Sequence, residues 1–128
     1  MAEPRALLTV GIVDDDAFIR TALGRLVRSI GYDAAIFEGA QALLSYAGLR
    51  ALSCVLADLQ MPGIGGIELI QILAERVPRL PVIAMTAYPN QIIRQRALDA
   101  GAASYLTKPF EAEQLESCLK ALGIGCRL

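Results

Sequence analysis

The chain has 128 residues, of which 55% are hydrophobic and 20% charged, so it is long and apolar enough for one full core and too apolar to be disordered. Twelve basic and thirteen acidic residues give a net charge of −1, which argues against a nucleic-acid-binding surface over the whole domain. The absence of histidine excludes a tetrahedral His/Cys zinc site and any catalytic dyad that contains histidine. The three cysteines, an odd number, lack metal-ligand spacing.

The sequence carries no pattern that points to a membrane. The N-terminal residues do not resemble a signal peptide, and no apolar run reaches the ~20 residues that cross a bilayer. We therefore expect a cytoplasmic protein without membrane attachment, and we expect no direct nucleic-acid binding by this domain.

Strand-like apolar runs alternate with amphipathic helices along the chain. In chain order the pattern predicts a strand at 7–13, a helix at 17–30, a strand at 33–37, a helix at 40–49, a strand at 54–57, a loop at 61–66, a helix at 67–77, a strand at 81–85, a helix at 91–100, a strand at 104–106 and a helix at 112–122. Asp16 stands at the N-cap position of the first helix, and Gly31 and Gly101 stand where two helices should end.

This alternation predicts a single α/β domain spanning 1–128, with its core at about 7–122. Strands that are apolar throughout are typical of parallel sheets covered by helices on both faces, with right-handed crossovers. The periodicity does not give the order of the strands in the sheet.

Five polar residues interrupt the apolar pattern at the carboxyl ends of the predicted strands. Asp14 and Asp15 follow the first strand, Asp58 ends the third, Thr86 ends the fourth, and Lys108 follows the fifth. Ligands of open α/β sheets bind at this edge, so we expect the five side chains to share one site.

The three carboxylates of this group predict a metal site. Asp58 ends a buried strand and needs a partner, and Asp14 and Asp15 would repel it if the first and third strands are neighbours. A hard divalent cation such as Mg²⁺ relieves the repulsion and leaves positions for phosphate oxygens. The alternative is that residues 14–16 form only a polar turn whose last member caps the helix, and such a run on its own is more often a cap than a metal site.

The same residues favour phosphoryl chemistry. A carboxylate beside Mg²⁺ can attack phosphorus to form an aspartyl phosphate. The phosphoryl oxygens then need a cation and a hydroxyl donor, which Lys108 and Thr86 supply. Each of these two residues alone is explained as well by a surface lysine or a strand-end hydroxyl, and their joint placement on one edge is what favours the functional interpretation.

Four motifs in this order resemble the receiver domain of bacterial two-component response regulators, over about residues 7–122. The motifs are Ile12-Val13-Asp14-Asp15-Asp16; Asp58-Leu59-Gln60-Met61-Pro62 followed by Gly66-Ile67-Glu68-Leu69; Met85-Thr86-Ala87; and Ala100-Gly101-Ala102 with Tyr105 and Lys108-Pro109-Phe110. The chain departs from the family at Gly63, where many relatives carry Asp.

The resemblance implies a flavodoxin-like fold with strand order 2-1-3-4-5 and a cis peptide bond before Pro109. It also implies a Mg²⁺ or Mn²⁺ ion. The implied ligands are Asp15 directly, Asp14 largely through water, Asp58, and the backbone carbonyl of Gln60.

The resemblance further implies that Asp58 accepts the phosphoryl group from a phosphohistidine of a sensor histidine kinase or a phosphotransfer protein. Lys108 contacts the phosphoryl group, Thr86 closes on it, and Tyr105 turns inward as Thr86 moves. The chain would be a switch and not an ordinary enzyme, although it assists its own phosphotransfer and dephosphorylation.

The expected output surface is formed by 91–100, 104–106 and 112–122. It would control an output domain or a partner, with transcription as the expected process, and it would also be the surface of an expected homodimer.

Three other functions remain open from the sequence. A pseudo-receiver that binds proteins without being phosphorylated is disfavoured because all the site residues are present. A phosphatase usually needs a second acid two residues after its nucleophile, where this chain has Gln60. A nucleotide-binding domain needs a glycine-rich turn after the first strand, where this chain has three aspartates.

Overall fold

The computed structural model describes residues 8–61 and 63–124. The start of the first predicted strand at residue 7, Pro62 of the acceptor-loop motif, and Cys126 lie outside the described residues.

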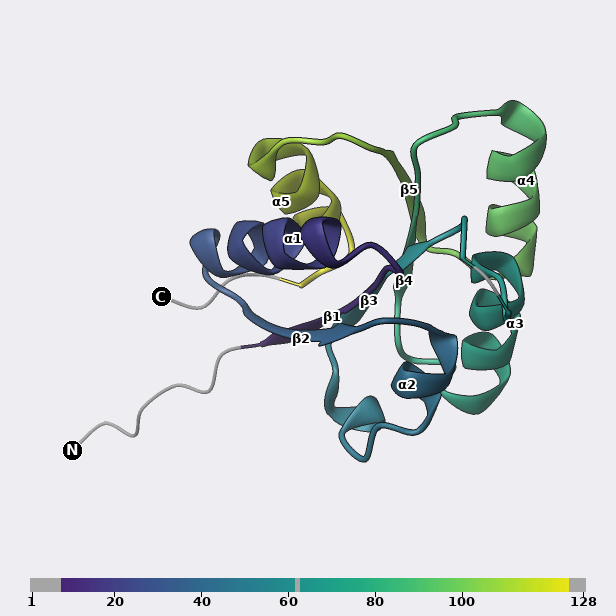
Figure 1. Ribbon diagram of the computed structural model, residues 1–128, viewed down its shortest axis with the longest axis horizontal. Helices are drawn as coiled ribbons and strands as arrows, with labels where there is room; N and C mark the ends of the chain where they lie inside the picture. Colours follow the sequence, from purple (N-terminus) through teal and green to yellow (C-terminus); the bar gives the residue numbers. More distant parts are fainter. Residues whose placement is uncertain (1–7, 62, 125–128) are drawn as a thin grey trace.

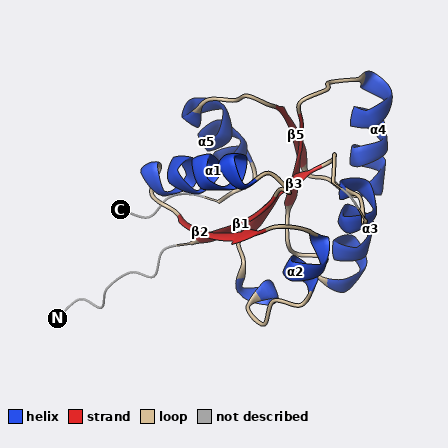
Figure 2. Cartoon of the chain, in the orientation of Figure 1, coloured by secondary structure: helices blue, strands red, loops and turns tan. Residues whose placement is uncertain are grey.

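Strands and helices alternate through the described chain, as predicted (Figures 1 and 2). In order they are β1 (Thr9–Val13), α1 (Ala17–Ser29), β2 (Asp33–Phe37), α2 (Ala40–Leu44), the short 3₁₀ helix η1 (Leu49–Ala51), β3 (Cys54–Asp58), α3 (Gly66–Arg76), β4 (Val82–Thr86), α4 (Gln91–Ala100), β5 (Ser104–Thr107) and α5 (Ala112–Ala121). Most bounds agree with the predicted ones or differ from them by one residue.

The predicted helix at 40–49 is wrong in its second half, because α2 ends at Leu44. The backbone N–H of Tyr46 turns back to the carbonyl of Leu43, and the Tyr46 ring packs edge-on against Phe37 with 5.1 Å between ring centroids. Ala47, expected to face the core, is exposed. The contact with Phe37 outweighs the weak helical pattern of this segment, which also contains a glycine at position 48.

The five strands form one parallel sheet in the order β2-β1-β3-β4-β5, which confirms the order that the resemblance implied. The register aligns Val13 of β1 with Ala57 of β3. Asp14 directly follows β1, and Asp58 is the last residue of β3. The register therefore brings two carboxylates from distant parts of the sequence to adjacent positions at one edge.

Helices cover both faces of the sheet: α1 and α5 lie on one side, and α2, α3 and α4 on the other (Figure 1). Along β3, Cys54 and Leu56 belong to the cluster with α1 and α5, whereas Val55 and Ala57 belong to the opposite cluster. Because both faces are buried, the central strands are apolar at every position before the last. Among the described residues, no helix is both long and apolar enough to cross a bilayer.

Local signals end and begin the helices where the sequence predicts. The Asp16 carboxylate accepts hydrogen bonds from the N–H groups of Phe18 and Ile19 at the start of α1. Gly101 ends α4 with a φ of 121°, a conformation that residues with a side chain rarely adopt.

The segment after β5 brings Lys108 back to the sheet edge. Its backbone N–H donates to the carbonyl oxygen of Thr86 at 2.7 Å, and the Lys108–Pro109 bond is cis, as expected. The polar end of β4 and the lysine are therefore held together by the backbone.

Gly66 begins α3 directly against the strand end that carries Asp58. A Cβ atom at this position would lie against the Asp58 carbonyl oxygen and 2.6 Å from the Leu59 Cα. Both neighbours are backbone atoms, so a side chain here requires the acceptor strand or the helix to move.

We expect Gly66→Ala to lower the free energy of unfolding by roughly 1–3 kcal/mol, the usual cost of overpacking, although Ala is the better helix former. Urea unfolding followed by circular dichroism measures this change. Gly65→Ser is the matched control, since a Cβ there meets nothing within 4 Å and Ser is a favourable N-cap. Equal stability of the two variants would contradict the expected clash.

Candidate functional site

Three carboxylates converge at the carboxyl edge of β1 and β3. Asp14, Asp15 and Asp58 each place one carboxylate oxygen within 4.8 Å of those of the other two. Asp14 is fully buried and Asp58 is 3% exposed, whereas Asp15 is exposed. The cluster thus has two buried members and one member that faces solvent.

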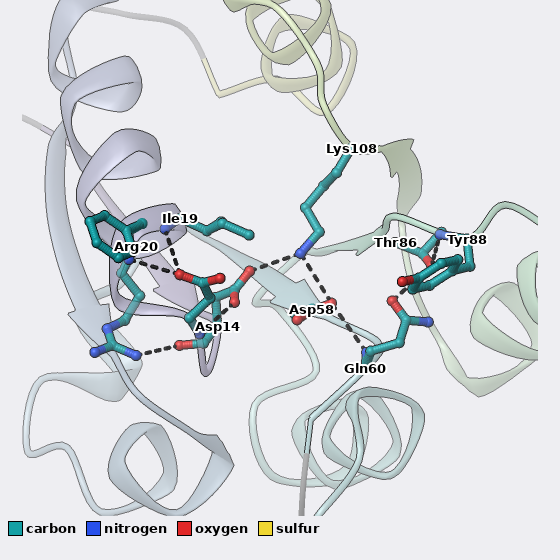
Figure 3. Close-up of polar contacts among 10 residues, drawn as sticks. Asp14, Ile19, Arg20, Asp58, Gln60, Thr86, Tyr88 and Lys108 are labelled. Carbon is teal, nitrogen blue, oxygen red and sulfur yellow. Dashed lines mark hydrogen bonds and ion pairs between the residues drawn. The ribbon is translucent and has the colours of Figure 1, made fainter.

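Asp14 is held from several sides. One carboxylate oxygen accepts the N–H of Asp16 at 2.9 Å, and the other accepts the Lys108 ammonium at 3.0 Å. The Arg20 guanidinium donates to the backbone carbonyl of Asp14 at 2.9 Å (Figure 3). Arg20 was not among the predicted site residues, because its position in the first turns of α1 does not reveal that the side chain returns to the strand end.

Lys108 lies between the two buried carboxylates, as Figure 3 shows. Its Nζ is 3.0 Å from Asp14 Oδ2 and 3.4 Å from Asp58 Oδ1. Burial lowers the pKa of Lys108, but the hydrogen bond to Asp14 and the charge of Asp58 outweigh burial and leave this pKa above its usual value. The ammonium is therefore charged at neutral pH.

Asp58 lies in a less favourable environment for a charge. Burial raises its pKa, the N–H of Gln60 lowers it through a hydrogen bond of 3.1 Å, the Asp14 charge raises it and the Lys108 charge lowers it. The net direction is upward from 3.8. One ammonium does not balance three carboxylates.

The donor set fits a hard divalent cation. The cluster offers carboxylate oxygens from both buried and exposed residues, and the backbone of Gln60 lies beside Asp58 through the N–H bond to its carboxylate. Mg²⁺ and Mn²⁺ prefer oxygen ligands of this kind. Lys108 alone does not compensate the charge of the three carboxylates, and the remaining negative charge also favours a divalent cation.

Thr86 is fully buried at the end of β4 and is linked to the cluster through Gln60. Its hydroxyl donates to Gln60 Oε1 at 2.9 Å and accepts the N–H of Tyr88 at 3.0 Å (Figure 3). The resemblance had implied a role for the backbone carbonyl of Gln60, and neither it nor the spacing from Asp58 had indicated this side-chain contact. A contact across 26 positions leaves no mark in local periodicity.

Tyr105 lies apart from the polar cluster. It is on β5 and packs against the core cluster on the α3 and α4 side. Its hydroxyl is enclosed and makes no hydrogen bond within the described part of the chain. The structure thus brings Asp14, Asp15, Asp58 and Lys108 together, joins Thr86 through Gln60, and leaves Tyr105 as a neighbour in the core.

Comparisons with known proteins show which family the chain is similar to. Residues 10–120 match the family model described as the response regulator receiver domain. The transcriptional regulatory protein FixJ of Bradyrhizobium diazoefficiens is 33% identical over 110 residues, which are 86% of this chain and 54% of FixJ. The chain spans about half the length, or less, of the first curated relatives that it matches.

Solved structures share the fold. The crystal structure of FixJ-N has a TM-score of 0.82 and 28% identity, and the match covers 97% of this chain and all of that one. The chemotaxis protein CheY4 of Vibrio cholerae has a TM-score of 0.83 at 24% identity, covering 91% of this chain and 99% of that one.

The pKa of Asp58 predicts the sign of a mutational effect on stability. A carboxyl group whose pKa is raised by folding binds more protons in the native than in the unfolded state. The stability that Asp58 contributes is therefore fully present below pH 3.8 and is lost as the pH rises through the raised pKa. Asn does not titrate. We therefore expect Asp58→Asn to raise the free energy of unfolding at pH 7, and to raise it progressively less as the pH falls toward 3.8.

Urea unfolding in EDTA at several pH values measures this difference. Asp99→Asn on the exposed part of α4 serves as the control, with a change within about 0.5 kcal/mol expected for a surface site. A wild-type protein that is the more stable of the two at pH 7 would contradict the predicted sign.

Proposed function

Because the chain belongs to the response regulator receiver domain family, we propose that it is a signalling switch that accepts a phosphoryl group on Asp58. The observation that carries the proposal is the placement of Asp58, a nearly buried carboxylate with Lys108 at 3.4 Å and two further aspartates beside it. A carboxylate in that setting can attack a phosphorus atom, and Lys108 can stabilise the negative charge on the phosphoryl oxygens.

The proposed donor is a phosphohistidine of a sensor histidine kinase or a phosphotransfer protein. A carboxylate oxygen of Asp58 forms a bond to phosphorus as the phosphorus–nitrogen bond of the donor breaks. The electron pair of that bond remains on the imidazole nitrogen. Lys108 already lies beside the Asp58 carboxylate and is charged, so it can compensate the phosphoryl oxygens without large rearrangement.

The residues proposed to hold Mg²⁺ or Mn²⁺ are Asp14, Asp15, Asp58 and the backbone carbonyl of Gln60. When bound, the ion supplies positive charge to the phosphoryl oxygens. Asp15 is the exposed member of the cluster and Asp14 is already bound by Lys108, which supports Asp15 as the direct ligand.

We propose that the output is read at the face of α4, β5 and α5. Thr86 ends β4 next to β5, and Tyr105 is on β5 itself, so movement of either residue alters this face. The name of FixJ supports transcription as the process that is controlled, and the same face is proposed for a homodimer. A cytoplasmic location and a domain spanning 1–128 belong to the same proposal.

Phosphorylation is tested with Mg²⁺ and acetyl phosphate, a small phosphodonor, followed by intact mass measurement. We expect the wild-type mass to increase by one phosphoryl group and the Asp58→Asn mass to stay unchanged. Lys108→Ala should gain the group more slowly, because it lacks the nearest cation. No gain over a wide range of donor and metal concentrations would instead favour a pseudo-receiver that binds partners without phosphorylation.

Metal binding is tested without the phosphodonor. We expect millimolar Mg²⁺ to raise the melting temperature of the wild-type protein, because the ion relieves repulsion among the carboxylates of the folded state. Asp15→Asn should lose most of that increase, whereas Asp99→Asn should keep it. An equal increase in both variants would contradict a site that contains Asp15.

A further inference from the structure

We propose that the Gln60 side chain is a latch that holds Thr86 in its unphosphorylated position and so sets how strongly a phosphoryl group drives the switch. The inference rests on the proposed function, since it concerns the step in which Thr86 moves toward Asp58. It assigns to Gln60 a role as a positioning residue that is separate from its backbone carbonyl.

The first argument is the hydrogen-bonding capacity of Thr86. A hydroxyl has a single proton to donate, and here that proton is donated to Gln60 Oε1 at 2.9 Å. The oxygen accepts the N–H of Tyr88 at 3.0 Å. Thr86 therefore has no second proton for a phosphoryl oxygen on Asp58, and it must leave Gln60 before it can donate to one.

The second argument is the difference in burial between the two partners. Thr86 is fully buried, whereas Gln60 is exposed. When the bond breaks, the Gln60 amide regains a partner from water, but the Thr86 hydroxyl must find another acceptor within the protein. The bond therefore stabilises the unphosphorylated position mainly through Thr86, and a charged phosphoryl oxygen is the stronger competing acceptor.

The third argument is that one residue contacts both ends of the switch. The N–H of Gln60 donates to Asp58 Oδ1 at 3.1 Å, while its side chain reaches Thr86 (Figure 3). The backbone bond fixes where the side chain starts, so the amide oxygen is presented to Thr86 from a defined position. A phosphoryl group on Asp58 would change the contacts of Gln60 at its backbone and those of Thr86 at the same time.

The latch acts on the equilibrium between the two positions of Thr86. It predicts a change in the affinity for a phosphoryl mimic, which is measured without any hydrolysis step. Without the Gln60 acceptor, the buried Thr86 O–H has no hydrogen-bond acceptor in the free protein. In the complex with the phosphoryl mimic, the mimic itself supplies the acceptor. The complex is then favoured over the free protein.

The test is the dissociation constant of beryllofluoride, a tetrahedral mimic of the phosphoryl group, measured by calorimetry in Mg²⁺. Gln60→Met keeps the length of the side chain and replaces the amide oxygen with a thioether sulfur, which is only a weak acceptor. We expect this variant to bind about two- to tenfold more tightly than the wild type, the ratio given by a hydrogen bond of ordinary net strength. Gln60→Leu repeats the test with a second side chain, and Gln71→Met on the exposed surface of α3 is the control, expected to bind as the wild type does.

A mutant cycle shows whether the effect passes through Thr86. In a Thr86→Val background, which lacks the hydroxyl, Gln60→Met should not change the affinity, and in a Thr86→Ser background, which keeps it, the increase should return. An increase that persists with Val, or no increase in Gln60→Met despite wild-type binding, would overturn the latch and leave the proposed function intact. A wild-type protein that does not bind beryllofluoride would overturn both.

Discussion

Two buried carboxylates and one ammonium group, contributed by three different strand ends, meet at the edge of the sheet. Lys108 bonds to Asp14 at 3.0 Å and lies 3.4 Å from Asp58. A charge in this setting is costly unless it is paired, and here the pairing is incomplete because negative charge remains in excess. This unfavourable free energy arises at the edge of the sheet where the carboxyl ends of β1, β3 and β5 bring the three groups together. The cation binding proposed for this cluster depends on that excess, since carboxylates that were fully compensated would have little affinity for a cation.

The rest of the fold serves to keep this cluster in place. Both faces of the sheet are covered, so β3 is buried along its whole length, Asp58 included. Gly66 lets α3 begin against the backbone of the same residue. Lys108 is tied to β4 through its own N–H, and Arg20 reaches from α1 to the carbonyl of Asp14. The backbone positions that anchor neighbouring elements are thus the ones that carry or adjoin the site residues. Substitutions at these positions are expected to affect both stability and chemistry.

Thr86, near the acceptor, and Tyr105, on the proposed output face, have contrasting environments. Thr86 has both of its hydrogen-bonding roles satisfied, by Gln60 and Tyr88. The enclosed hydroxyl of Tyr105 has no such partner among the described residues. A switch needs two arrangements of similar free energy, and the exchange of one hydrogen-bond acceptor for another at Thr86 is a change of suitable size. The proposed role of Gln60 is to adjust that balance through its hydrogen bond with Thr86.

The amino-acid sequence by itself determined the alternation of strands and helices, the N-cap at Asp16, the helix end at Gly101 and the polar residues at the strand ends, because each of these depends on local periodicity and backbone preference. The strand order came from the resemblance and not from the periodicity. Local pattern failed at residues 45–49, where the contact between Tyr46 and Phe37 ended α2 early. Only the tertiary structure decided that Lys108 bridges Asp14 and Asp58, that Arg20 returns to the first strand, and that Gln60 holds Thr86 across 26 positions. These contacts depend on sheet register and side-chain reach, and neither leaves a signal in the spacing of residues along the chain.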